Sequence, residues 1–261
     1  MKAAAVQTRP RFGDRKGNVE RALALMDRVE ADLFVLPELF GTGYLFTSRE
    51  ELHALSEPRD GETVSALLAY TARRGCAVYG GFAERGGERL YNTAVLAAEG
   101  EAIAFYRKLH LFSKEKEIFD TAQNPPVTAE WRGTRLGLMV CFDWIFPEMA
   151  RTLALDGAQV LLLCANLVLP WCQQAMVTRS LENGVFTVLA NRVGTEERGG
   201  RRLAFTGGSG IVGPRGEVLA RASADGEEVI VAEIDPARAD DKMVTEDNHL
   251  LRDRRADRYR L

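Results

Sequence analysis

Several short, almost wholly apolar runs in this chain are each followed closely by a polar residue. Such runs lack the polar alternation of a half-exposed strand, so they predict strands buried on both faces, in sheets covered by helices. The predicted strands of this kind lie at 3–7, 33–36, 136–140, 160–163 and 186–190. Because each of them needs a covering layer on both sides, the chain is constrained to a layered α/β architecture.

Helical patterns separate these strands. Asn18 is predicted to cap a helix whose apolar positions follow the 3.6-residue period. Residues 63–74 form a second predicted helix, which a glycine ends. Pro147 suits the first turn of a third helix, and a fourth covers roughly 171–184.

Segments rich in β-forming residues and joined by tight turns lie between and after the helices. They are predicted at 76–84, 90–98, 102–107, 209–212, 218–221 and 229–234. Gly86 and Gly87 predict a hairpin turn between the first two. Hairpins join antiparallel strands, whereas helix-linked strands run parallel, so we expect mixed sheets and an α/β layered sandwich.

The composition is that of an ordinary globular protein and argues against several classes. The chain has 261 residues, a formal net charge of −3 and a pI near 5.8, which disfavours a nucleic-acid-binding protein or a polybasic membrane anchor. No apolar run approaches the roughly 20 residues of a transmembrane helix, and the first residues turn polar too early for a signal peptide. We expect one domain over 1–261, located in the cytoplasm, with no nucleic-acid or membrane partner.

The cysteines and histidines show no metal-ligand pattern. The four cysteines, at 76, 141, 164 and 172, include no Cys-x-x-Cys pair, and the three histidines are not spaced as ligands. Scattered cysteines in a chain of this length also make no disulfide scaffold. We therefore expect no metal site and no cofactor.

Polar residues at the ends of the predicted strands are the candidate site, because ligands of α/β sheets bind beyond the carboxyl ends of the strands. Glu38 follows one apolar strand, Lys108 follows a β-rich segment and Cys141 follows another apolar strand. The other residues in such positions are Asp143, Asn166, Asn191 and Arg192.

Cys141 is the candidate nucleophile. It lies at a predicted strand-to-helix turn, where the amides and the dipole of the helix are expected to lower the pKa of the thiol. The alternative is a buried structural cysteine, which is the commoner role of this residue. Its position alone does not separate the two interpretations.

A thiol nucleophile needs a base, for which there are two candidates. His110 lies near a strand end, and Glu38 follows an apolar strand and a proline, so it is expected to be partly buried. Lys108 is placed to supply positive charge to a developing oxyanion. The alternatives are a packed or loop histidine, a paired or helix-capping glutamate and a solvated strand-end lysine.

Three segments, each at a strand end and in this order, carry a resemblance to a known family. They are LPELF at 36–40, YRKLHLF at 106–112 and CFDWIFPE at 141–148. Together they resemble the nitrilase superfamily of carbon–nitrogen hydrolases with its Glu-Lys-Cys triad. Further matches at 166–167, 179–183, 190–194 and 208–216 extend the resemblance over nearly the whole chain. It implies a four-layer α-β-β-α sandwich with mixed sheets.

The resemblance also assigns roles to individual residues. It makes Glu38 the base, Lys108 the oxyanion-stabilising lysine and Cys141 the nucleophile, with the backbone N–H of Phe142 as a second oxyanion donor. The implied reaction is attack of the thiolate on an amide or nitrile carbon, release of ammonia and hydrolysis of a thioester.

Many members of the family carry a second glutamate after the lysine that helps to position the substrate. Here Glu115 is our choice and Glu117 the alternative, because the loop length shifts the register. Aromatic residues are expected to wall a small pocket, with core or interface packing as the alternative. The candidate substrate-binding residues are Phe142, Trp144, Tyr44 and Asn166, with Trp171 as a further aromatic candidate.

The segment 141–143 reads Cys-Phe-Asp rather than the Cys-Trp-Glu of typical nitrilases. The segment 143–148 is similar to that of N-carbamoylputrescine amidases and to that of compact thermophile-type enzymes described as nitrilases or amidases. We therefore expect a small-amide amidase, with a nitrilase or an N-carbamoyl amide hydrolase as alternatives. A non-catalytic binding module is a remote alternative, because such proteins usually lose the cysteine or the lysine.

The resemblance further implies a homodimer formed through the helices near the active-site face. Residues 236–261 are predicted to be a C-terminal arm that crosses to the partner, since they hold too few apolar residues for a core of their own. A solvated tail is the alternative.

Overall fold

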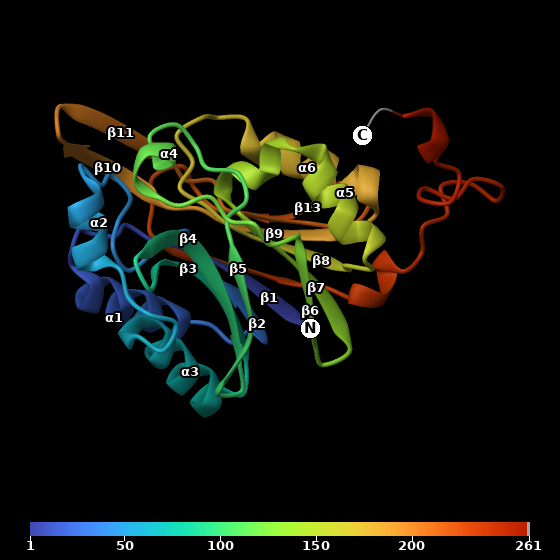
Figure 1. Ribbon diagram of the computed structural model, residues 1–261. Helices are drawn as coiled ribbons and strands as arrows, with labels where there is room; N and C mark the ends of the chain where they lie inside the picture. Colours follow the sequence, from blue (N-terminus) through green and yellow to red (C-terminus); the bar gives the residue numbers. More distant parts are fainter. Residues whose placement is uncertain (260–261) are drawn as a thin grey trace.

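Two six-stranded sheets pack face to face, with helices on the outer face of each (Figure 1). The structure is a computed structural model that describes residues 1–259. The first sheet has the order β14 (Glu228–Glu233), β1 (Lys2–Gln7), β2 (Leu33–Val35), β3 (Ala77–Gly86), β4 (Arg89–Ala98), β5 (Glu101–Arg107). The second has the order β13 (Val218–Arg221), β12 (Gly210–Val212), β9 (Phe186–Ala190), β8 (Val160–Cys164), β7 (Thr134–Val140), β6 (Val127–Trp131).

The helices form the outer layers of the expected α-β-β-α sandwich. The first sheet is covered by α1 (Arg15–Met26) and α3 (Glu62–Arg74), and the second by α5 (Pro147–Leu155) and α6 (Cys172–Asn183). Beyond the strand ends lie α2 (Arg49–Leu55), α4 (Glu115–Ile118) and the hairpin of β10 (Val193–Arg198) and β11 (Arg201–Thr206), grouped in Figure 1. Short 3-10 turns are η1 (Cys141–Ile145), η2 (Pro236–Ala239) and η3 (Ala256–Arg258). In residues 1–259 no helix combines the length and apolar character needed to cross a membrane.

Successive residues of the central strands face different layers, which explains why these strands are apolar throughout. In β1, Ala3 and Ala5 pack in the cluster between the two sheets, whereas Ala4 and Val6 pack in the cluster beneath α1 and α3. All four are fully buried. Period-two alternation persists, but both faces are core.

One hydrogen bond ties the two sheets together across the core. The hydroxyl of Tyr79 in β3 donates to the carbonyl oxygen of Met139 in β7, at 3.1 Å. A buried tyrosine hydroxyl needs such a partner. The bond fixes β3 of one sheet relative to the strand that leads into Cys141 in the other.

Strand directions bring the candidate residues to one edge. β1, β2 and β3 run parallel, as do β7, β8 and β9. β5 is antiparallel to β4, which is antiparallel to β3, so β5 runs in the direction of β2. Glu38 after β2 and Lys108 after β5 therefore lie at the same edge of the first sheet.

The predicted cap of the first helix is wrong. α1 begins at Arg15, and the Asp14 side chain accepts the N–H of Gly17 at 3.1 Å. Asn18 is buried inside the helix, where its Nδ2 donates to the carbonyl oxygen of Gly41 at 2.7 Å. A polar residue near a helix start thus secures the loop after Glu38 instead of capping the helix.

The strands at 127–131 and 193–206 were not predicted. β6 is an edge strand whose residues are mostly half-buried, and β10–β11 is a separate two-stranded hairpin. Both carry many polar residues, so neither gives the apolar signal of the central strands. The hairpin matters because it reaches the site described below.

Gly81 in β3 is required by a close approach of the Glu38 loop. Its amide donates to the carbonyl oxygen of Pro37, and its own carbonyl accepts the amide of Phe40, both at 3.2 Å. A Cβ at this position would lie 2.7 Å from Glu38 Cα and 2.9 Å from the Leu39 nitrogen. Because these are backbone atoms, only displacement of the loop relieves the clash.

We therefore expect Gly81→Ala to lower the free energy of unfolding by about 1–3 kcal/mol, the usual cost of overpacking a core. The matched control is Gly210→Ala in β12, where the nearest atom to an added Cβ is 3.7 Å away. Urea denaturation of both variants measures the difference. Equal stabilities of the two variants would contradict the close approach.

Candidate active site

Lys108 lies at the centre of the site. Its Nζ is buried, 2.7 Å from Glu38 Oε1 and 2.8 Å from both carboxylate oxygens of Glu115. Asn92 in β4 donates from Nδ2 to the same Glu38 Oε1, at 2.7 Å. Among the described residues Glu38 Oε2 is buried without a hydrogen-bond partner. The cluster holds one ammonium between two carboxylates and leaves one carboxylate oxygen uncommitted.

Cys141 lies at a sharp turn between β7 and η1. Its φ is +43°, a left-handed conformation that costs a non-glycine residue on the order of 1–3 kcal/mol. The buried Asp143 holds the turn, because its Oδ2 accepts the amide of Val140 at 2.9 Å and the hydroxyl of Tyr106 at 2.7 Å. Its Oδ1 accepts the amide of His110 at 3.2 Å.

The same kind of backbone conformation flanks the two carboxylates. Leu39, directly after Glu38, has a φ of +50°, and Ser113, which precedes Glu115 by two residues, also has a φ of +50°. Non-glycine residues in this region are uncommon and cluster at functional sites. A left-handed residue therefore lies at or next to each of the three titratable side chains of the site: Glu38, Glu115 and Cys141.

The charges of the site are strongly coupled. Burial would lower the pKa of the Lys108 ammonium, but the Glu115 and Glu38 carboxylates outweigh burial and raise that pKa well above its usual value. Burial raises the pKa of Glu115 despite its contact with Lys108. Burial and then the Glu38 carboxylate raise the pKa of the Cys141 thiol well above its usual value, against the effect of Lys108.

The predicted lowering of the Cys141 pKa is therefore wrong for the free protein. The helix-terminus argument considers only the local turn, whereas the whole site adds desolvation and negative charge. Burial and the nearby carboxylates thus favour the thiol form of Cys141 over the thiolate.

Tyr44 extends the site beyond the charged cluster. Its hydroxyl donates to Glu115 Oε1 at 2.7 Å. The backbone amides of Tyr44 and Leu45 donate to the buried carboxylate of Glu196, at 3.2 and 2.6 Å to Oε2. Glu196 in turn pairs with the buried Arg192. A second buried ion pair thus holds the loop that presents Tyr44.

The Cys141 thiol faces a very small cavity of about 20 Å³. Phe142, Trp144 and Asn166 line it, and the sequence predicts these three residues among those that bind the substrate. Asn166 donates from Nδ2 to the carbonyl oxygen of Glu38 at 2.8 Å, and its buried Oδ1 has no partner among residues 1–259.

Several residues weighed from the sequence lie elsewhere. His110 Nδ1 lies 2.7 Å from Asp143 Oδ1, and its ring stacks on Phe146 at 3.9 Å, so it supports the Cys141 turn and does not line the cavity. Glu117 is exposed and pairs with Lys114. Trp171 is 56% exposed and absent from the cavity wall, so its placement there is wrong.

Three supporting residues were missed by sequence analysis: Asn92, Tyr106 and Glu196. Asn92 lies in the middle of an otherwise largely apolar strand, and this polar interruption is a usable signal. Each of the three has a partner that is distant in sequence, for example 54 residues between Asn92 and Glu38. Among the described residues no group of three or more His, Cys, Asp and Glu side chains is arranged to hold a metal ion.

Comparison with known proteins places this geometry in a family. The family model described as carbon–nitrogen hydrolase matches residues 2–242. A nitrilase of Pyrococcus abyssi is 43% identical over 263 residues, covering 99% of each chain. An (R)-stereoselective amidase of a Pseudomonas species is 36% identical, covering 98% of this chain and 92% of that protein.

Solved structures agree with the sequence relatives. An amidase from Nesterenkonia sp. superposes with a TM-score of 0.80 at 30% identity, covering 98% of this chain and 94% of that one. A variant of that amidase carries the acetamide moiety of fluoroacetamide covalently on its active-site cysteine. The family model and the relatives together establish that the chain belongs to the carbon–nitrogen hydrolase family.

Proposed function

We propose that this carbon–nitrogen hydrolase cleaves small primary amides to a carboxylic acid and ammonia, with Cys141 as nucleophile. The observation that carries the proposal is a buried thiol that feels the charge of a buried carboxylate whose second oxygen is uncommitted. Glu38 Oε1 is held by Lys108 and Asn92, so Oε2 is the oxygen that accepts the thiol proton.

The first half of the reaction forms a thioester. Proton transfer from Cys141 to Glu38 conserves the net charge of the buried cluster, whereas loss of the proton to solvent adds a second uncompensated negative charge. The thiolate attacks the amide carbon, and Lys108 and the Phe142 amide stabilise the oxyanion of the tetrahedral species. Protonated Glu38 gives its proton to the departing ammonia.

The second half hydrolyses the thioester. Glu38, again a carboxylate, takes a proton from water as the water oxygen attacks the acyl carbon; the carbon–sulfur bond then breaks, the acid leaves, and Glu38 returns the proton to the Cys141 sulfur. Glu115 holds the ammonium of Lys108 in place through two contacts of 2.8 Å. Because the ammonium keeps its proton, Lys108 acts as a fixed charge and not as an acid.

The first test of the proposal is Cys141→Ala. We expect a loss of kcat of at least about 1,000-fold, measured as ammonia release, with little change in the thermal midpoint. Cys172→Ala is the matched control, because Cys172 is also a buried free cysteine but lies in α6, outside the cavity wall. Substantial activity in purified Cys141→Ala would overturn the assignment.

The second candidate reaction is hydrolysis of a nitrile, which the 43% identity to a nitrilase favours. Two buried acceptors without partners, Glu38 Oε2 and Asn166 Oδ1, support the amide instead. A primary amide offers two N–H donors on its leaving nitrogen, whereas a nitrile offers none. An unpaired buried acceptor costs about 1–3 kcal/mol.

We therefore expect kcat/KM for propionamide to exceed that for propionitrile by roughly 5- to 150-fold, which corresponds to one unpaired acceptor. Asn166→Ala should reduce the value for the amide more than that for the nitrile, because only the amide loses a hydrogen bond. Initial rates of ammonia release for both substrates provide the measurement. A higher wild-type kcat/KM for the nitrile would show that the protein is a nitrilase and overturn the proposed amide hydrolysis.

We further propose a cytoplasmic homodimer that buries α5, α6 and the arm of residues 236–261. The four free cysteines suit a reducing compartment. Large apolar side chains are exposed on this side of the molecule: Leu155, Trp171, Leu181, Met243, Val244 and Tyr259. Such clustering is typical of a protein interface.

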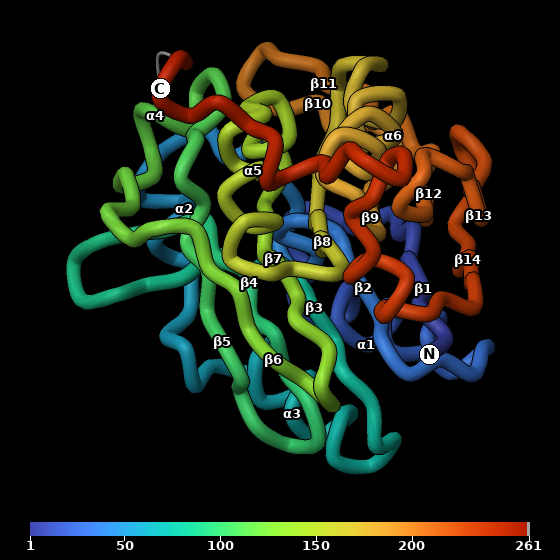
Figure 2. Tube along the Cα trace, turned by 90° about the vertical axis from the view of Figure 1, so that its right-hand side faces the viewer, coloured from blue at the N-terminus to red at the C-terminus, as the bar shows by residue number. Residues whose placement is uncertain are grey.

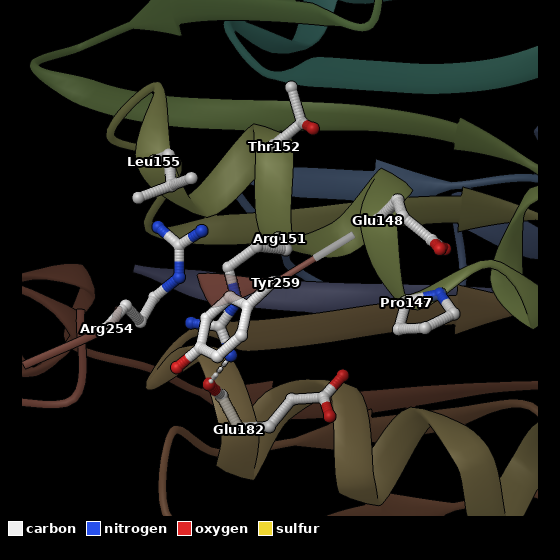
Figure 3. A pocket seen from close by; sticks show the side chains of 8 residues that line it. All are labelled: Pro147, Glu148, Arg151, Thr152, Leu155, Glu182, Arg254 and Tyr259. Atoms are coloured by element: carbon white, nitrogen blue, oxygen red, sulfur yellow. Dashed lines mark hydrogen bonds between the residues drawn. The ribbon is translucent and has the colours of Figure 1, made fainter. Parts of the chain in front are cut away.

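The arm supports this proposal because it packs loosely on its own protomer. Lys242 anchors its start by donating to the carbonyl oxygens of Asn183 and Gly184, at 3.0 and 2.8 Å. The arm then crosses in front of α5 and α6 (Figure 2). Between Arg254 and Tyr259 of the arm and α5 lies a cavity of about 430 Å³, far larger than the one at Cys141 (Figure 3). Arg260 and Leu261, also assigned to the arm, lie outside the described residues.

Light scattering tests the dimer. We expect Leu181→Glu in α6 to reduce the measured mass from that of a dimer to that of a monomer, because it places a charge on the proposed interface. Truncation after Met243 should also weaken the dimer, because it removes most of the arm from the proposed interface. The control is Ile103→Glu in β5, where the side chain is 41% exposed on another element. A monomeric wild-type protein would contradict the proposal.

A further inference from the structure

A second cavity of about 220 Å³ adjoins the small one at Cys141. The two cavities share Phe112 and Val168 in their walls, so they are neighbouring chambers of one site. The larger chamber also reaches Tyr44 and Glu115, at the far side of the charged cluster. The volume beside the thiol is too small for more than the reacting group, so the rest of a substrate must extend into the larger chamber.

The inner face of β11 runs along this larger chamber. Phe205 packs edge-on against Tyr44, with ring centroids 6.1 Å apart. Leu203 and Arg201 follow at alternate positions on the same face of the strand, and both line the chamber. Arg201 also lines a further cavity and is partly exposed, so solvent and ions reach its guanidinium. Along this face of β11 the side chains therefore change from apolar, at Phe205 and Leu203, to cationic at Arg201.

The charges in this chamber leave one cation uncompensated. Glu115 is already paired with Lys108, and Lys114 is paired with Glu117. Arg201 makes no ion pair or side-chain hydrogen bond with the part of the chain that the structure describes, and its exposure is intermediate. The Arg201 guanidinium therefore has no anionic partner among the described residues, and an anion of the substrate can fill that role.

We propose that the larger chamber binds the acyl chain of the substrate and that Arg201 binds a carboxylate at the far end of that chain. The substrate is then a short acid that carries a primary amide at one end and a carboxylate at the other, with apolar methylenes between. This inference rests on the amide hydrolysis proposed above and adds the class of acyl group. A planar guanidinium binds a carboxylate through two parallel hydrogen bonds, which fixes the chain direction and length.

Two substrates of matched chain length test the inference. They are the monoamide of glutaric acid and pentanamide, which differ in the terminal carboxylate. We expect the wild-type kcat/KM for the acid amide to exceed that for pentanamide by about tenfold, mainly through KM, because the carboxylate contact is the same in ground and transition states. The preference should decrease with added salt, since Arg201 is partly exposed.

Arg201→Gln should abolish the preference, because it lowers kcat/KM for the acid amide far more than kcat/KM for pentanamide. The matched control is Arg202→Gln, because Arg202 is the neighbouring residue in β11, points to the opposite face and is exposed. In the Cys141→Ala background, calorimetry should show the acid amide binding about tenfold more weakly after Arg201→Gln. This measurement needs no turnover.

The outcomes separate the two proposals. Equal wild-type values for both amides, or a preference that survives Arg201→Gln, would overturn the role of Arg201 while amide hydrolysis stands. No ammonia release from any amide would overturn the proposed amide hydrolysis and this inference with it. If Arg202→Gln loses the preference to the same extent, the preference comes from the overall charge of the β10–β11 hairpin. That outcome would contradict a carboxylate site at Arg201.

Discussion

The structure depends most on the burial of one positive charge. The Lys108 ammonium has no contact with solvent, and its ion-pair partners among the described residues are Glu38 and Glu115. Removing one partner of a buried ion pair costs about 3–5 kcal/mol, because the remaining charge is left uncompensated. The loops that carry Glu38 and Glu115 must therefore close on Lys108 for the protein to fold, and this closure assembles the site.

The same charge balance explains how Cys141, a thiol with a raised pKa, is activated in the mechanism that we propose. The pocket opposes a free thiolate, because burial and Glu38 both disfavour it. Once Glu38 holds the thiol proton, one of the two opposing carboxylates is neutral and Lys108 acts on the sulfur. In the proposed mechanism, activation of Cys141 is thus tied to proton transfer to Glu38.

The sequence predicts the layered fold and the residues of the proposed triad because both rest on local signals. Apolar strands followed by Glu38, Lys108 and Cys141 can be recognised without knowing their partners. The choice between Glu115 and Glu117 needed the structure. Both lie in the single turn of α4, two positions apart, so they point in different directions and only Glu115 contacts Lys108.

Contacts between distant segments could not be predicted. The bond from Asn92 to Glu38 and the support of the Tyr44 loop by Glu196 join residues far apart in sequence. The pKa of Cys141 was predicted in the wrong direction for the same reason, because a rule about helix termini contains no information on what else surrounds the thiol.

The hydrogen bond between Tyr79 and Met139 has a consequence for how this enzyme fails. Glu38 and Lys108 extend from one sheet and Cys141 extends from the other. The distance between the Cys141 sulfur and the Glu38 carboxylate therefore depends on how the two sheets pack against each other. A slight shear between them would leave every strand paired and the core dry, yet it would move the sulfur away from its acceptor. Moderate heating or a substitution in the core far from the site should therefore abolish activity while the circular dichroism spectrum remains that of the native protein.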